Sequence, residues 1–108
     1  MKLITQALIK QFKKYPPRSQ EMEEDPLFIA KYFNPAGAGT WYVMEAEPLN
    51  KDDWWFFGYV ESPIDPLFNE YGSFTLKELE NIRLPFGLTI ERDMYFEPTR
   101  KSLIIKEE

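Results

Sequence analysis

The aromatic run WWFFGYV at residues 54–60 constrains the fold of this 108-residue chain more than any other segment. Successive side chains of a β-strand point to opposite faces of a sheet, so an extended run would place aromatic rings on both faces. One face would carry Trp54, Phe56 and Val60, and the other Trp55, Phe57 and Tyr59. The run is either a central strand covered on both sides or a strand with one face partly exposed to a protein partner, for which Trp and Tyr are the usual anchors.

Three further segments are rich in β-branched and aromatic residues and are separated by turn-forming sequences. We expect strands at residues 27–33, 40–47 and 70–74, in addition to the strand at 54–61. The turn-forming sequences NPAGAG and PLNKDD join the first three strands. The pattern predicts an antiparallel four-stranded meander. Gly58, inside the aromatic strand, predicts a bulge or the close approach of another backbone.

An N-terminal helix is predicted over residues 6–14, with Thr5 as its N-cap. Tyr15 precedes Pro16 and ends this helix, because a residue before proline avoids the helical conformation. Residues 16–26 carry prolines and charges, which is typical of a connecting loop.

The clearest local signal is the capping box formed by Thr75 and Glu78, with Phe74 and Leu79 in the positions of a hydrophobic staple. It predicts a second helix from Leu76 to about Arg83. A short strand is expected at Asp93–Phe96. The predicted fold is therefore α+β, with helices packed on one antiparallel sheet. The chain length predicts a single domain at 1–108, divided into a basic helix (1–15), a core (20–98) and a polar tail (99–108).

The chain contains no cysteine and no histidine. These absences exclude disulfides, zinc sites ligated by Cys or His, and hydrolases that use a Ser–His or Cys–His pair. The N-terminal residues have helical spacing and not the unbroken apolar run of a signal peptide, and no segment approaches the ~18 apolar residues of a membrane span. We therefore expect a cytoplasmic protein that has no membrane association and no cofactor.

Charge is segregated along the chain. Residues 1–20 hold five bases and no acid, whereas residues 21–97 hold sixteen acids and five bases, a net charge of −11. One interpretation is that the basic and the acidic regions are both simply solvated surfaces with no binding role. The functional interpretation is an acidic body that steers a charged partner and occupies a basic groove made for nucleic acid. Direct nucleic-acid binding by the acidic body is not expected. Most of the affinity of a protein for nucleic acid comes from basic side chains that neutralise the phosphates.

We predict that the partner-binding surface lies on and beside two adjacent strands, with Trp54 or Trp55 as its aromatic anchor. The acidic residues assigned to it are Glu45, Glu47, Asp52, Asp53, Glu61 and Asp65. Glu45 would share a face with Trp41 and Val43, where it needs a charged partner such as Arg92 or Lys31.

The segment Glu91-Arg92-Asp93 places two carboxylates around a guanidinium. It is either a structural ion-pair motif that pins the tail to the sheet, or the site of a carboxylate-only metal enzyme in which Glu91 and Asp93 hold magnesium. No Glu or Asp has a Lys two positions later, as the common Glu-x-Lys nuclease motif requires. The structural interpretation is favoured, so no metal site and no catalytic residue is assigned.

Several motifs occur together in a recognisable order. They are residues 31–33 (KYF), 40–43 (TWYV), 56–58 (FFG), 71–74 (YGSF) with Leu76, Glu78 and Leu79, and 87–96 (GLTIERDMYF). Over roughly residues 20–98 the chain resembles the family called domain of unknown function 2958, which is found in phages, plasmids and other mobile elements. The family implies no enzymatic activity.

The resemblance also extends to mobile-element proteins that block the Cas9 nuclease, the type II-A anti-CRISPR inhibitors. It implies a non-catalytic protein that binds a host enzyme or its guide-RNA complex. Two alternatives stay open: an accessory protein for plasmid or conjugative-element maintenance that touches DNA through the basic helix, and the carboxylate-only metal enzyme.

Overall fold

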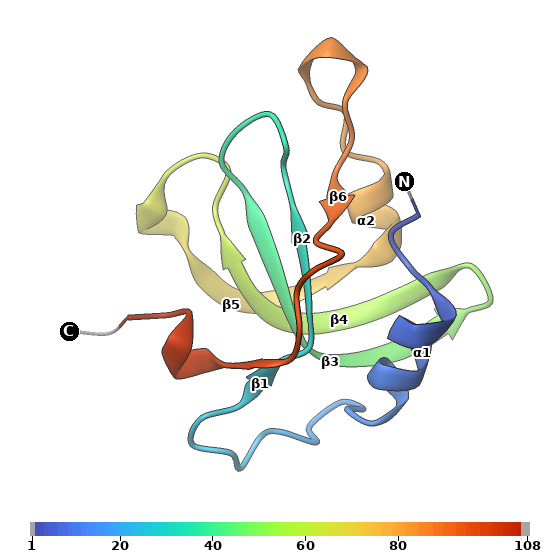
Figure 1. Ribbon diagram of the computed structural model, residues 1–108, viewed down its shortest axis with the longest axis vertical. Coiled ribbons are helices and arrows are strands. Elements are labelled where there is room, and N and C mark those ends of the chain that lie inside the picture. Colours follow the sequence, from blue (N-terminus) through green and yellow to red (C-terminus); the bar gives the residue numbers. More distant parts are fainter. Residues whose placement is uncertain (1, 107–108) are drawn as a thin grey trace.

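A computed structural model describes residues 2–106 and shows an α+β fold built on a strongly twisted antiparallel sheet (Figure 1). The main sheet has five strands in the order β5-β4-β3-β2-β6, and a separate small sheet pairs β1 with β7. The elements are α1 (Gln6–Lys13), β1 (Leu27–Phe28), β2 (Ala30–Phe33), β3 (Thr40–Asn50), β4 (Asp53–Glu61), η1 (Pro66–Phe68), β5 (Glu70–Thr75), α2 (Leu76–Glu80), η2 (Pro85–Gly87), β6 (Glu91–Arg92), β7 (Thr99–Arg100) and η3 (Lys101–Leu103).

The predicted meander is confirmed, since β2, β3, β4 and β5 are neighbours in sequence order and pair antiparallel. The predicted strand count was wrong, because Glu91 and Arg92 pair with Phe33 and Tyr32 and add β6 as a fifth strand. The strand expected at Asp93–Phe96 was also wrong. The Phe96 N–H donates to the carbonyl of Asp93, so this segment turns away from the sheet.

Both helices begin where their capping residues predicted. Thr5 Oγ1 accepts the N–H of Leu8 at 3.2 Å, and Thr75 Oγ1 accepts the N–H of Glu78 at 3.1 Å. Helix α2 ends at Glu80 and not near Arg83, because Arg83 leaves the helix and forms a β-bridge with Thr89. No helix of the described chain is long and apolar enough to cross a bilayer.

The two helices pack on the same face of the main sheet, which we call the first face. Phe12 of α1 is fully buried there, with its ring centroid 5.4 Å from that of Trp54 and 5.2 Å from that of Phe56. Leu76 and Leu79 of α2 belong to the same buried cluster. Both helices are thus committed to the first face and leave the opposite face to other segments.

The opposite, second face carries a separate aromatic cluster around Phe28, Tyr42 and Met44. The Phe28 and Tyr42 rings stack with centroids 5.0 Å apart, and Phe96 lies 6.0 Å from Tyr42. Ile104 and Ile105 pack against this cluster from the C-terminal segment, which lies on the left in Figure 1, away from the two helices. The C-terminal segment therefore covers one end of the second face.

The small sheet fixes the C-terminal segment in place. Leu27 pairs with Arg100 and Phe28 with Thr99. Just beyond this sheet, the Asp25 carboxylate accepts hydrogen bonds from the backbone N–H and the hydroxyl of Ser102, at 2.9 and 2.7 Å. These hydrogen bonds lower the pKa of Asp25 below its ordinary value.

A β-bulge in β3 changes which side chains reach the second face. Val43 lies opposite Gly58 and Glu45 lies opposite Phe57, so Met44 is an extra residue in the strand. The close approach predicted at Gly58 is confirmed, because a Cβ there would collide with the Tyr42 carbonyl oxygen, whereas the bulge lies in the neighbouring strand β3 and not at Gly58 itself. Beyond the bulge, Glu45 shares the second face with Phe57 instead of the first face with Val43.

Candidate functional site

The two neighbouring tryptophans occupy opposite faces of β4, and only one of them is accessible. Trp54 is 7% exposed and packs in the first-face core beside Phe12. Trp55 is half-buried on the second face. Of the two anchors considered from the sequence, the structure leaves Trp55 as the available one.

Glu45 does not belong to the exposed acidic surface to which the sequence assigned it. The residue is 6% exposed, and its carboxylate accepts the backbone N–H of Arg18 at 2.8 Å and of Gln20 at 3.0 Å. The expectation that Lys31 or Arg92 pairs with Glu45 was wrong, because Lys31 pairs with Asp93 at 3.7 Å and Arg92 lies in β6, which is not adjacent to β3. Two charge-assisted hydrogen bonds from the backbone replace an ion pair and fix the loop that precedes β1.

Two other assigned acids also satisfy backbone groups. Asp53 Oδ1 accepts the N–H of Lys77 at 3.0 Å, which helps to hold the start of α2. Asp65 caps η1 by accepting the N–H of Leu67 at 2.9 Å. Both carboxylates therefore stabilise the fold by accepting hydrogen bonds from backbone N–H groups.

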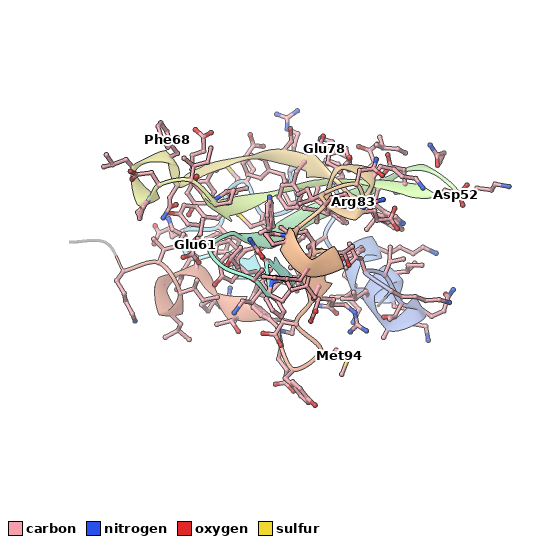
Figure 2. All side chains as sticks on the ribbon, turned by 90° about the horizontal axis from the view of Figure 1, so that it is seen from above. Asp52, Glu61, Phe68, Glu78, Arg83 and Met94 are labelled. Carbon is pink, nitrogen blue, oxygen red and sulfur yellow. The ribbon has the colours of Figure 1, made fainter. Side chains whose placement is uncertain are left out.

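The remaining assigned acids lie at separate places. Glu47 is exposed and lies opposite Trp55 in the β3–β4 ladder. Asp52 is exposed in the turn at one end of β4, and Glu61 is half-buried at the other end (Figure 2). At ~3.3 Å per residue these two lie roughly 30 Å apart along the strand. The structure does not bring the predicted set together as one surface, and the contact role of its exposed members stays a prediction.

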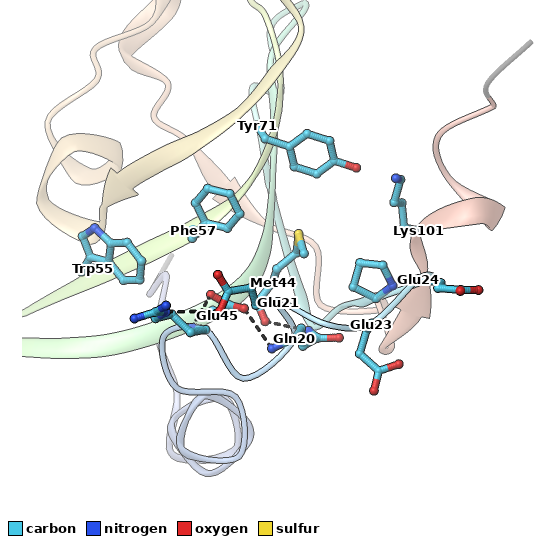
Figure 3. Close-up of a pocket in the computed structure, with 12 residues that line it drawn as sticks. Gln20, Glu21, Glu23, Glu24, Met44, Glu45, Trp55, Phe57, Tyr71 and Lys101 are labelled. Atoms are coloured by element: carbon cyan, nitrogen blue, oxygen red, sulfur yellow. Dashed lines mark hydrogen bonds and ion pairs between the residues drawn. The ribbon is translucent and has the colours of Figure 1, made fainter.

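What the structure brings together instead is a groove of about 430 Å³ on the open end of the second face. Figure 3 shows the rings of Trp55, Phe57 and Tyr71 along one side of it. Residues from the loop before β1, from β3 and from η3 complete the lining; they are Arg18, Gln20, Glu21, Glu23, Glu24, Pro26, Met44, Glu45 and Lys101.

The aromatic side of the groove continues the second-face cluster out to solvent. Tyr71 contacts Tyr59 edge-on at 5.0 Å and Phe57 in a stacked arrangement at 6.4 Å between centroids. Phe28 at the buried end has no exposed surface, whereas Tyr71 at the open end is 39% exposed. The aromatic run was interpreted either as a strand covered on both sides or as a strand with one face partly exposed. At this end of the sheet the second face is partly exposed.

The loop wall is held in a strained conformation. Arg18 has φ of 70°, a left-handed backbone that costs a residue with a side chain about 1–2 kcal/mol. The hydrogen bond from its N–H to Glu45 and the neighbouring bonds of Gln20 keep it there. Strain of this kind persists only where the surroundings fix it, and such places are often ligand-binding sites.

Gln20 is the wall residue that sequence reasoning missed. It is 4% exposed, and its side-chain amide donates to the carbonyls of Leu27 and Met44 at 2.8 and 2.9 Å while accepting the N–H of Leu27 at 2.7 Å. Nothing in the surrounding polar sequence PPRSQEMEEDP distinguishes this glutamine from its exposed neighbours.

The family described as a protein of unknown function (DUF2958) matches residues 3–105. The chain belongs to the DUF2958 family. No curated protein and no solved structure matches it.

In this DUF2958 protein the Glu91-Arg92-Asp93 motif is the edge of the main sheet. Glu91 and Arg92 form β6, and the Asp93 N–H donates to the carbonyl of Lys31 at 3.0 Å. Arg92 Nε also donates to the carbonyl of Lys2 at 3.4 Å, near the N-terminal helix. Among residues 2–106, no three acidic side chains gather closely enough to hold a metal ion.

The DUF2958 groove is lined by side chains of mixed chemical character. Its side chains offer aromatic surface, carboxylates and two cations, one from Arg18 and one from Lys101. Aromatic faces beside carboxylates suit a cationic group, since both attract positive charge.

Proposed function

We propose that this protein acts by binding, as a non-catalytic inhibitor of a nucleic-acid-handling host enzyme, most specifically the Cas9 nuclease, in the cytoplasm of the host cell. The observation that carries the proposal is the open end of the second face, where three partly exposed aromatic rings lie beside a wall containing glutamates. Aromatic anchors beside polar residues are the usual centre of a protein–protein contact.

The charge of the chain supports this type of partner. Sixteen acids against five bases in residues 21–97 give the body a strong negative field. An enzyme that grips nucleic acid presents basic channels, and Cas9 in addition reads its target with arginines. A compact acidic protein can occupy such a channel and exclude the nucleic acid by competition.

The direct test is a target-cleavage assay with purified Cas9–guide complex, together with co-elution on a sizing column. We expect cleavage to fall and the two proteins to co-elute. Unchanged cleavage without co-elution would reject the proposal.

A pair of matched variants assigns any inhibition to the groove. Glu23→Gln with Glu24→Gln removes two exposed charges at the groove, and Glu78→Gln with Glu97→Gln removes two exposed charges elsewhere. We expect the first pair to weaken inhibition and the second to leave it nearly unchanged. Equal effects would mean that total charge, and not the groove, decides binding.

The exposed lysines of α1 favour a second candidate, an accessory protein that contacts DNA during maintenance of a mobile element. Lys10, Lys13 and Lys14 are all exposed at the end of the helix whose apolar side packs on the first face. They also lie near the helix C-terminus, where cations stabilise a helix without any partner. DNA binding that weakens with salt, and weakens further when the three lysines become alanine, would support this candidate over the inhibitor.

A further inference from the structure

We propose that the groove receives the side chain of an arginine from a protein partner, with its guanidinium lying against Trp55 and Phe57 and paired with Glu21. The inference rests on the proposed function in one respect only, namely that the partner is a protein with a basic surface. It goes further by naming the group that the groove recognises.

The aromatic wall has the arrangement that a guanidinium requires. Trp55 and Phe57 are two residues apart on β4, so their side chains leave the same face of the sheet. Both are half-buried, with one part packed on the protein and another part lining the groove. Arginine stacks on such exposed ring faces through its planar, delocalised charge.

The charge balance of the lining favours a cation. Four glutamates line the groove against two cations, Arg18 and Lys101. The Glu45 carboxylate is occupied by backbone N–H groups, but Glu23 and Glu24 are exposed and take part in no ion pair among the described residues. The excess of carboxylates would raise the local concentration of basic groups.

The chain already places its own cations on these surfaces. The Lys101 ammonium lies 5.5 Å from the centre of the Tyr71 ring. Arg18 Nε donates to Glu21 Oε2 at 3.2 Å, and the two side chains are 82% and 55% exposed. An ion pair that is so open to water contributes little, so an incoming arginine can exchange with Arg18 at Glu21.

Arginine fits this exchange better than lysine. A guanidinium pairs with a carboxylate through two parallel N–H groups, stacks on rings and is more weakly hydrated than an ammonium. Its transfer into a half-open aromatic groove therefore costs less desolvation than the transfer of a lysine.

The test is a titration of the full chain with short capped peptides of arginine, of lysine and of citrulline, the neutral isostere of arginine. The indole N–H signals of the three tryptophans report the site, because Trp41 and Trp54 are buried in the first face and Trp55 lines the groove. We expect the arginine peptide to shift the Trp55 signal most. Citrulline should leave it unchanged, and lysine should bind at least about fivefold more weakly.

Two variants at the groove should have opposite effects. Glu21→Gln should weaken the arginine peptide at least about threefold, because it removes the paired carboxylate. Arg18→Gln should strengthen binding by a similar factor, because it removes the internal competitor. Lys13→Gln and Glu78→Gln are exposed controls away from the groove and should change the affinity less than their counterparts at the groove.

Binding that is equal for arginine and citrulline, or equal for arginine and lysine, would overturn the inference. So would a shift of the Trp54 signal in place of Trp55, or no binding at all. The peptide titration does not involve Cas9. If the protein binds arginine in the groove but neither reduces cleavage nor co-elutes with the Cas9–guide complex, the proposed function is rejected and this inference is kept. If the protein inhibits cleavage and the inhibition is unaltered by Glu21→Gln and by Arg18→Gln, this inference is rejected and the proposed function is kept.

Discussion

The Glu45 carboxylate accepts a hydrogen bond from the backbone N–H of Gln20, 25 residues earlier in the sequence, at a distance of 3.0 Å. A second bond from the Arg18 N–H completes the arrangement, and both bonds lie at the foot of the groove. One buried side chain of β3 thus fixes the position of the whole loop wall.

We expect Glu45→Gln to lower the free energy of unfolding by about 2 kcal/mol, because a charge-assisted bond is lost and an amide N–H₂ then faces a backbone donor. Urea denaturation measures the change. Glu47→Gln is the matched control, since Glu47 lies on the same face of β3 but is exposed, and it should change stability by less than about 0.5 kcal/mol. Equal effects of the two changes would show that the buried bonds are not important for stability.

Gly58 and Gly72 form a second matched pair, since they lie directly opposite each other in the β4–β5 ladder. A Cβ on Gly58 would collide with the Tyr42 carbonyl, whereas one on Gly72 would have no neighbour within 4 Å. We expect Gly58→Ala to destabilise the fold by about 3 kcal/mol or more, and Gly72→Ala to be neutral or slightly stabilising. Thermal unfolding followed by circular dichroism measures both. Similar melting temperatures for the two variants would contradict this account of the bulge.

Phe86 and Gly87 form the tip of an exposed loop and both have left-handed backbone angles, with φ of 63° and 73°. Phe86 is 97% exposed, so its strain is not offset by packing. We expect Phe86→Asn to stabilise the protein by about 0.5 kcal/mol and Gly87→Ala to destabilise it by about 1 kcal/mol. Chemical denaturation measures both changes. A large loss of stability with Phe86→Asn would mean that the aromatic ring supports the fold.

Alkaline pH should unfold the protein through its buried tyrosines. Burial raises the pKa of Tyr32 above the ordinary value, and burial together with Glu61 raises the pKa of Tyr42. A raised pKa in the folded state means that stability is complete below the unfolded-state pKa of about 10 and is lost as the pH rises above it. Tyrosinate absorbance and circular dichroism should therefore change together above this pH.

Tyr32→Phe removes one of the two groups that resist ionisation, so the loss of stability above pH ~10 should become shallower. Tyr95→Phe provides the control, since Tyr95 is 88% exposed. Ionisation of Tyr32 and Tyr42 well below the pH at which the protein unfolds would show that burial does not control the pKa of these two residues.

Local rules predicted the helix starts and the central strands. Thr5 and Thr75 each cap a helix through a contact three residues along the chain, and the strand at residues 54–61 follows from the alternation of its large side chains. Signals of this kind lie within a few residues of one another, so the sequence alone displays them.

The site depended on features that no local pattern contains. The extra residue Met44 shifts the register of β3, and a shift of one residue moves every later side chain to the other face, which is why Glu45 was assigned to the wrong face. The loop wall is fixed by contacts between Gln20 and Met44 across 24 residues. The edge strand β6 has only two residues, too few for any periodicity to appear.

The pairing of β1 with β7 has a consequence for biosynthesis. Leu27 and Phe28 emerge from the ribosome early, but their partners Arg100 and Thr99 and the covering residues Ile104 and Ile105 emerge about seventy residues later. The meander and the first-face core can assemble during translation, whereas the second aromatic cluster stays open to water until the end of this segment is released. In that interval the nascent chain exposes Tyr42 and Phe28, so crowding or slow elongation should affect the solubility of the new protein more than that of the finished one.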